Sequence, residues 1–139
     1  MRILIMGLPG AGKTHLAKRL QIHLNCAWYN ADKVREMAND WDFTEAGRRR
    51  QSNRMNNIAT FEGTNGRTVI CDFVCPTSET RSAFGADITI WMDTIEAGRF
   101  DDTNKIFEIP TDVDYHIDAF MSDEEIIAFA NELKDKYHV

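Results

Sequence analysis

Short apolar runs alternate with segments of helical period along this chain. The first run, RILIM at residues 2–6, is nearly all apolar, which is typical of a strand buried on both faces of a parallel sheet. Further strands are predicted at residues 26–29, 68–73, 86–93 and 113–117. The strands therefore recur along the whole chain, with room for a helix or a loop between each pair.

The segments between the runs predict helices. Leu16, Leu20 and Leu24 recur every fourth residue and form one apolar stripe on a helix over residues 13–24. The last helix is expected to begin at Ser122, with Glu125 completing a capping box, and to end near residue 137. Other helices are predicted at residues 32–39, 45–64 and 77–84, with GTNG at 63–66 ending the second of these.

This alternation predicts an α/β fold of three layers, a five-stranded parallel sheet flanked by helices on both faces. The length of 139 residues fits a single domain over residues 1–139. Residues 94–112 show no clear period. The tryptophans are expected in the core: Trp28, Trp41 and Trp91.

Composition narrows the range of partners. The net charge of −6 disfavours binding to nucleic acid, which requires Lys and Arg to neutralise phosphates. No apolar run approaches the roughly 20 residues that cross a membrane. The three cysteines, Cys26, Cys71 and Cys75, lie in apolar surroundings and favour reduced core thiols, which indicates a cytoplasmic protein.

The strongest motif is GLPGAGKT at residues 7–14, called the phosphate loop below. It matches G-x-x-x-x-G-K-[ST] and lies directly after a predicted strand and before a predicted helix, as a triphosphate site requires. We expect Lys13 to contact the transferred phosphate of ATP and the Thr14 hydroxyl to bind Mg²⁺. The predicted ATP-binding residues are Gly7, Leu8, Pro9, Gly10, Ala11, Gly12, Lys13 and Thr14.

Kinases and hydrolases both use such a loop. The chain lacks recognisable base-specificity loops of GTPases and is shorter than usual motor ATPases. The combination favours a small-molecule kinase in which residues 94–112 act as a lid.

Charged residues near the expected ligand crevice are candidates for acceptor chemistry. Asp32 follows the second strand and is a candidate base or metal ligand, although an aspartate there would also cap a helix. Arg35 is either an anion clamp or part of a surface salt bridge. Asp72, at the end of the third strand, competes with Asp32 for the metal.

The helix over residues 45–64 adds one arginine to these candidates. A helical count backward from its core-type residues reaches Gln51 and Arg48, so Arg48 is expected to point inward. Arg49 and Arg50 lie off this stripe and are expected in solvent. Phe43 and Phe107, in irregular segments, are either clamps for a flat ring or plain loop packing.

With these residues in place, the chain resembles the adenylylsulfate kinase family, whose members transfer a phosphate from MgATP to the 3′-hydroxyl of adenosine 5′-phosphosulfate. The similarity covers nearly the whole chain. It rests on GLPGAGKT, on NADKVR at 30–35, on DFTEAGRRRQ at 42–51, on VICDFVCP at 69–76 and on NKIF at 104–107.

The resemblance implies roles for individual residues. Lys13 and Asp32 would be catalytic, and Thr14, Asp32 and Asp72 would bind the metal. The implied acceptor-binding residues are Arg35, Phe43, Arg48, Gln51, Val74, Lys105 and Phe107. The implied cofactors are ATP and Mg²⁺, and the implied partners are small nucleotides, with a homodimer compatible with the sequence.

Several positions depart from the family pattern. Asn30 replaces the first aspartate of a pair, Gln51 replaces an asparagine, and Asp72 and Cys75 replace serines. The lid is shorter, with IFEIP at 106–110. A kinase for another hydroxyl compound and a nucleotide-binding regulatory protein with little turnover therefore remain alternatives.

Overall fold

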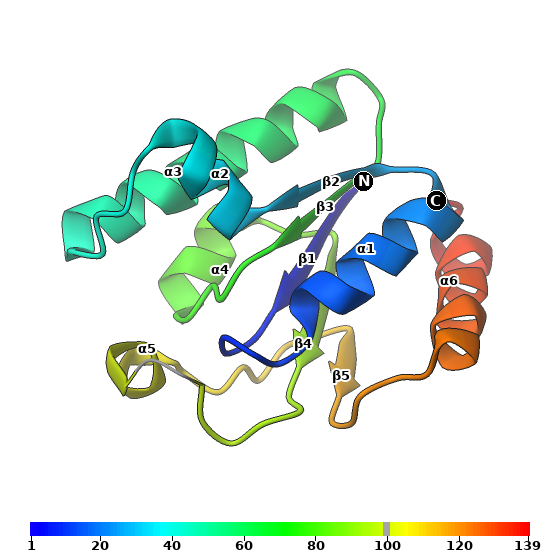
Figure 1. Cartoon of the computed structure of the whole chain (residues 1–139). Coiled ribbons are helices and arrows are strands. Elements are labelled where there is room, and N and C mark those ends of the chain that lie inside the picture. Colours follow the sequence, from blue (N-terminus) through cyan, green and yellow to red (C-terminus); the bar gives the residue numbers. More distant parts are fainter. Residues whose placement is uncertain (99–100) are drawn as a thin grey trace.

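A five-stranded parallel sheet forms the centre of the computed structural model, which describes residues 1–98 and 101–139 (Figure 1). The strands are β1 (Arg2–Met6), β2 (Ala27–Asn30), β3 (Val69–Asp72), β4 (Ile88–Met92) and β5 (Tyr115–Ile117). They lie in the order β2-β3-β1-β4-β5, and each neighbouring pair is parallel. All the carboxyl ends therefore meet at one edge of the sheet.

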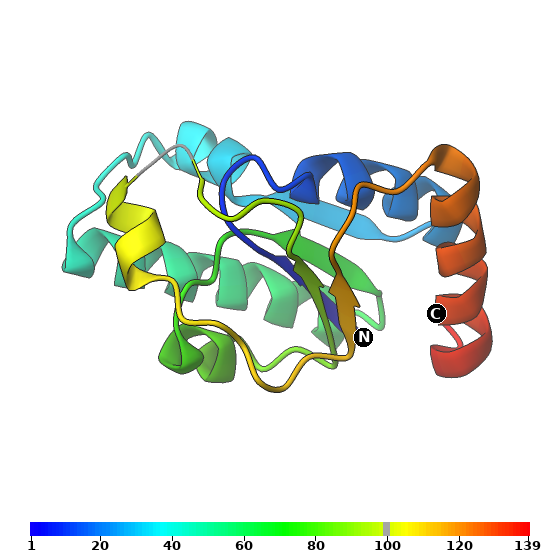
Figure 2. The ribbon, with the colours of Figure 1, turned by 90° about the horizontal axis from the view of Figure 1, so that it is seen from below.

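Helices cover both faces of this sheet, as Figures 1 and 2 show together. Helices α1 (Lys13–Leu24) and α6 (Asp123–Tyr137) lie on one face, and α3 (Glu45–Thr64) and α4 (Ser78–Phe84) lie on the other. Helix α2 (Ala31–Ala38) follows β2 directly, and the short α5 (Asp101–Ile106) lies beyond the carboxyl ends of the strands. The predicted three-layer α/β fold is confirmed.

The core divides into two clusters, one for each face. The stripe of Leu16, Leu20 and Leu24 on α1 is buried and packs with residues of α6 against one face of the sheet. Met55 of α3 and Phe84 of α4 are each at most 1% exposed and pack against the opposite face. Alternate residues of β1 supply both clusters, because successive side chains of a strand point to opposite faces.

Capping explains where several helices begin. Ser122 and Glu125 form the predicted capping box of α6, each side chain bonding the backbone N–H of the other. Asn30, not Asp32, caps α2, since its side-chain oxygen accepts the backbone N–H of Lys33 at 3.0 Å. The alternative role of Asp32 as a helix cap is therefore wrong.

Three details of the expected structure differ. Helix α5 was not predicted, because its six residues carry no apolar period. Trp41 was expected in the core but is 51% exposed, in the connection between α2 and α3. Arg50 was expected in solvent, and although exposed it makes ion pairs with Asp40 and Asp42.

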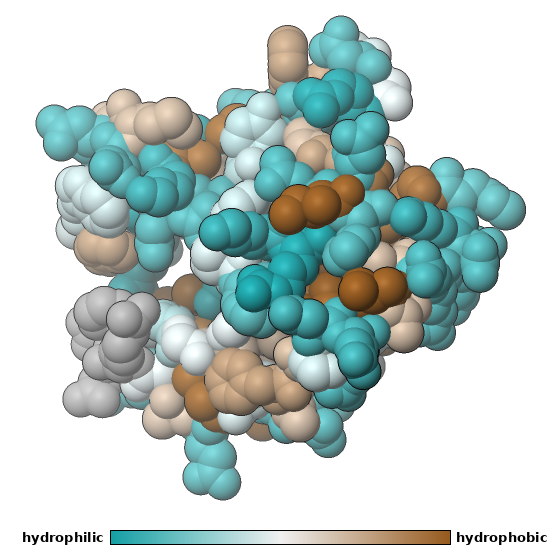
Figure 3. Space-filling model, turned by 45° about the vertical axis from the view of Figure 1, so that its right-hand side comes forward, coloured by the Kyte–Doolittle hydropathy of each residue, from teal (hydrophilic) through white to brown (hydrophobic). Residues whose placement is uncertain are grey.

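The described surface is mostly polar. Figure 3 shows one face on which hydrophilic residues predominate and hydrophobic residues lie singly or in small groups. Among the described residues, no helix is both long enough and apolar enough to cross a membrane. The three cysteines are free and buried, as expected.

Candidate active site at the carboxyl edge of the sheet

The phosphate loop joins β1 to α1 in a conformation that only glycine adopts easily. Gly10 and Gly12 both have φ of 91°, in the left-handed region that favours glycine. Gly7 passes so close to β4 that an added Cβ would lie 2.5 Å from the carbonyl oxygen of Met92. The loop is thereby held against the sheet edge, with the start of α1 facing the same space.

Lys13 is the first residue of α1 and is only 9% exposed. Its Nζ donates a hydrogen bond to the carbonyl oxygen of Leu8 at 2.9 Å, which folds the side chain back over the loop. This places the positive charge of the lysine above the turn of the loop, where a bound triphosphate would lie.

Asp72 ends β3 and is 1% exposed. Its Oδ1 accepts from Asn30 Nδ2 at 3.0 Å and, more weakly, from Thr14 Oγ1 at 3.4 Å. Its Oδ2 accepts from Trp28 Nε1 at 2.5 Å. Burial raises the pKa of the Asp72 carboxyl above its ordinary value, and these hydrogen bonds together with the charge of Lys13 oppose that rise.

The donor atoms around Asp72 fit a hard cation. A carboxylate and the hydroxyl of Thr14 are oxygen ligands, of the kind that Mg²⁺ prefers, and they lie beside the phosphate loop. Mg²⁺ typically keeps several waters and uses few protein ligands. Among the described residues, no group of three or more acidic, histidine or cysteine side chains could hold a metal ion.

Asn30 lies directly opposite Asp72 in the β2–β3 ladder. Its amide nitrogen also donates to Thr14 Oγ1 at 3.1 Å. The side chain thus joins the phosphate loop, the end of β3 and the start of α2. Asp72 supplies the buried carboxylate here from β3. The adenylylsulfate kinase pattern has an aspartate instead at position 30, on the neighbouring β2.

Asp32 and Arg35 both lie on α2 but in different environments. Asp32 is exposed in the first turn and makes no hydrogen bond or ion pair with the described residues. Arg35 is 5% exposed, and its Nη1 donates to the carbonyl oxygens of Asp40 at 2.8 Å and Asp42 at 3.3 Å. Burial lowers the pKa of Arg35, and the nearby carboxylates oppose this, Asp40 most strongly.

Aromatic and helical neighbours surround Arg35. The guanidinium carbon lies 4.4 Å from the centre of the Phe43 ring, and that ring is 55% exposed. Arg48 is half-buried at the start of α3. Gln51 is 5% exposed, and its amide donates to the carbonyl oxygen of Ala31 at 2.9 Å. Both Phe43 and Arg35 therefore remain suited to contact a ligand, whereas the amide of Gln51 is engaged within the protein.

The end of the predicted lid packs against the start of α4. Phe107 follows α5 directly, and the guanidinium carbon of Arg81 lies 5.1 Å from the centre of its ring. Arg81 also donates to the carbonyl oxygens of Cys75 and Glu108, which ties this segment to the start of α4. Lys105 is exposed, and Val74 is half-buried just after β3. Part of the predicted lid, at residues 99–100, lies outside the described residues.

A pocket of about 160 Å³ opens between the phosphate loop and this segment. Its lining is Leu8, Trp91, Met92, Asp93, Ile95, Glu96, Phe107 and Ile109. The predicted lid therefore borders the same space as the phosphate loop.

Two further residues border the site without a signal in the sequence. An added Cβ on Gly12 would lie 2.9 Å from the ring of Phe120, so this 62% exposed aromatic lies against the phosphate loop. Arg81 fixes Phe107, as described above. Neither belongs to a motif, and each reaches the site only through the packing of the fold.

A family model described as an AAA domain matches residues 3–105, from β1 into α5. The chain belongs to this AAA domain family. No curated protein matches the chain in sequence.

Solved kinase structures share the fold of this AAA domain protein. The APS kinase CysC of Mycobacterium tuberculosis, in complex with AMPPNP and APS, is 20% identical with a TM-score of 0.78, covering 99% of this chain and 97% of that one. Shikimate kinase of Aquifex aeolicus is 16% identical with a TM-score of 0.68, covering 99% and 98%. A gluconokinase of Sinorhizobium meliloti is 14% identical with a TM-score of 0.68, covering 99% and 95%. The expected likeness to adenylylsulfate kinases is confirmed in the fold.

Proposed function

We propose that this protein is an ATP-dependent phosphotransferase that phosphorylates the hydroxyl group of a small anionic acceptor. The observation that carries the proposal is the meeting of Lys13, Thr14 and Asp72 at one point of the sheet edge. The buried Arg35 of α2, the helix that follows β2 directly, supports it. Such a kinase needs a loop that binds the triphosphate, oxygen ligands for the metal ion and a positively charged site for the acceptor.

The proposed reaction needs little covalent chemistry from the protein. The acceptor oxygen forms a bond to the γ-phosphorus of ATP, the bond from that phosphorus to the β–γ bridging oxygen breaks, and ADP leaves. Lys13 would stabilise the charge on the transferred group. Asp32, exposed in the first turn of α2, would accept the proton of the hydroxyl. Thr14 and Asp72 would hold Mg²⁺, which neutralises phosphate charge when bound.

We propose adenosine 5′-phosphosulfate as the acceptor. Arg35 and Arg48 would bind its anionic group, and Phe43 and Phe107 would contact the adenine ring. Val74, Lys105 and Gln51 would complete the binding site for this acceptor. The fold shared with an APS kinase solved in complex with APS supports this choice, together with the exposed ring of Phe43 beside Arg35.

An acceptor panel tests the proposal. The protein is incubated with MgATP and adenylylsulfate, shikimate or gluconate, and ADP release is followed. Release that depends on adenylylsulfate supports the proposal. Release with another acceptor alone would replace it by a different kinase, an alternative that the shikimate kinase and gluconokinase folds favour. Tight ATP binding without acceptor-dependent release would indicate a regulatory nucleotide-binding protein.

The variant Asp32→Ala tests the proposed base. We expect turnover to fall by roughly 10²- to 10⁴-fold, the usual contribution of general-base help, while ATP affinity changes little. Isothermal titration with a non-hydrolysable ATP analogue measures that affinity. A collapse of ATP binding in a folded variant would instead assign Asp32 to the metal site.

A further inference from the structure

We infer that Asp40 is a positioning residue that fixes the acceptor side of the site. It would act by holding the α2–α3 connection, residues 39–44, against α3. This inference rests on the proposed function, because Arg35 and Phe43 matter for an acceptor only if the protein has one. Asp40 itself belongs to no motif recognised in the sequence.

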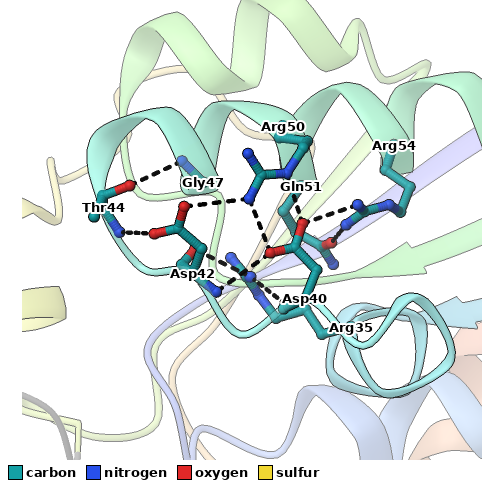
Figure 4. A network of polar contacts seen from close by, with 8 residues as sticks. All are labelled: Arg35, Asp40, Asp42, Thr44, Gly47, Arg50, Gln51 and Arg54. Atoms are coloured by element: carbon teal, nitrogen blue, oxygen red, sulfur yellow. Dashed lines mark hydrogen bonds and ion pairs between the residues drawn. The ribbon is translucent and has the colours of Figure 1, made fainter.

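The Asp40 carboxylate forms ion pairs with two arginines of α3 (Figure 4). Arg50 donates from Nε to Oδ2 at 2.7 Å and from Nη2 to Oδ1 at 2.9 Å. This is a bidentate ion pair, in which two charge-assisted hydrogen bonds act together. Arg54 Nη2 donates to Oδ2 at 2.9 Å. The Asp40 side chain is only 11% exposed, and these hydrogen bonds hold its pKa well below the ordinary range.

The backbone of the same connection holds Arg35. Arg35 Nη1 bonds the carbonyl oxygens of Asp40 and Asp42, and the next residue, Phe43, places its ring beside the guanidinium. Any displacement of Asp40 therefore moves the two carbonyls that orient Arg35. Figure 4 shows Arg35 and Asp40 approaching each other between α2 and α3.

Arg35 keeps donors for a ligand. A guanidinium carries five N–H groups on three nitrogens. In the described residues, only Nη1 of Arg35 makes hydrogen bonds, which leaves Nε and Nη2 without a protein partner on a side chain that is 5% exposed. A nearly buried arginine that is oriented by main-chain carbonyls and retains free donors is suited to bind an anion.

A glycine contact fixes the connection independently of charge. Gly47 of α3 approaches the connection so closely that an added Cβ would lie 2.2 Å from the carbonyl oxygen of Asp42. That oxygen is one of the two that hold Arg35. A methyl group at position 47 would therefore displace the same connection without removing any ion pair.

The test uses two variants with matched controls. Asp40→Asn removes the charge from the paired carboxylate, and Glu45→Gln, which disrupts the exposed pair with Arg49, is its control. Gly47→Ala displaces the connection, and Gly63→Ala is its control, because an added Cβ at Gly63 of the same helix meets nothing within 4 Å. Thermal unfolding verifies that each variant is folded.

Three measurements follow on each folded variant. They are the KM for adenylylsulfate, the Kd for an ATP analogue, and hydrogen–deuterium exchange of the peptide spanning residues 39–47. We expect both test variants to exchange faster in this peptide and to raise the acceptor KM roughly 10- to 100-fold, as misplaced positioning groups do. The Kd for the ATP analogue and both controls should stay near wild type.

The outcomes separate the inference from the proposed function. One outcome is that wild type phosphorylates adenylylsulfate while the Asp40→Asn variant and its control Glu45→Gln have the same KM for adenylylsulfate. In that case the inference is wrong and the proposed function stands. If wild type turns over no acceptor, the proposed function fails. Unchanged exchange in the 39–47 peptide of Asp40→Asn would overturn the inference in that case too, because Asp40 would then not fix the connection.

Discussion

Asn30 connects three parts of the candidate site through one side chain. Its amide nitrogen donates to Asp72 and to Thr14, and its oxygen caps α2. The resemblance to adenylylsulfate kinases leads one to expect a carboxylate at this position. In the fold, the neighbouring strand supplies that carboxylate from Asp72, and an amide beside it avoids the repulsion of two close negative charges.

We therefore predict that Asn30→Asp destabilises the protein without metal. The new carboxylate would lie near Asp72 Oδ1, lose two donated hydrogen bonds and repel the buried charge. We expect a loss of about 1–3 kcal/mol in the free energy of unfolding, the usual cost of leaving a buried polar group unsatisfied. Urea denaturation with EDTA measures this loss.

Magnesium supplies the second half of this prediction. MgATP should stabilise Asn30→Asp more than wild type, since a cation relieves repulsion between paired carboxylates. Asn53→Asp, at an exposed position of α3, is the control and should respond to MgATP as wild type does. Equal stabilisation of Asn30→Asp and wild type by MgATP would contradict a metal site at Asp72.

At the scale of elements, local sequence pattern predicts the long helices well. The bounds of α3 agree with the prediction, and α1 and α6 carry the expected leucine stripe and capping box. Helix α5 lacks such a pattern. Asn104 of α5 bonds the backbone of Gly98, six residues earlier, through both its side-chain oxygen and nitrogen, so a side-chain contact rather than an apolar period holds this segment.

The α2–α3 connection shows the same limit. Trp41 was expected in the core from its residue type alone, yet its ring is exposed. It lies between Asp40 and Asp42, which both form ion pairs with Arg50 of α3. These ion pairs depend on where α3 passes the end of α2. No pattern within residues 39–44 reports that geometry.

The ion pairs of this connection predict a pH dependence of stability. Arg50 and Arg54 lower the pKa of Asp40 below its ordinary value of 3.8 in the folded protein. A lowered folded pKa means that the ionised carboxylate stabilises the fold above the unfolded pKa and loses this effect as pH falls through the folded value. The stability difference between wild type and Asp40→Asn should therefore be full at neutral pH and shrink below pH 3.8.

Guanidinium denaturation of both proteins from neutral pH to below this value measures the difference. Asp42→Asn should show the same sign, because Thr44 and Arg50 lower the pKa of Asp42. A difference that stays constant into the acid range would mean that Asp40 stabilises the fold through its shape and not through its charge.

At the scale of the whole molecule, the order of the strands assembles the site. Thr14, Asn30 and Asp72 lie far apart in the chain and meet because β1, β3 and β2 are neighbours. The sequence predicts each strand and its polar end separately. The strand order, and with it the contact between Asn30 and Asp72, depends on packing of all the layers at once, which explains why that contact was not predicted.

The two core clusters allow a test of whether these layers unfold together. Cys26 packs in the cluster with α1 and α6, while Cys71 and Cys75 pack in the cluster with α3 and α4. Burial raises the pKa to about 11 for Cys26, about 12 for Cys71 and about 11 for Cys75. All three are therefore protonated thiols near neutral pH, and the thiolate is the reactive form.

We predict that a thiol reagent such as DTNB labels none of the three cysteines in the native protein until the chain unfolds globally. Their labelling rates should be equal and should rise together with denaturant, because one cooperative transition exposes both clusters. Mass spectrometry of digested samples distinguishes the sites, and fully denatured protein, in which all three react at once, is the control. Faster labelling of Cys26 alone would show that the α1–α6 layer opens without the opposite layer, and the sheet would then not couple its two faces.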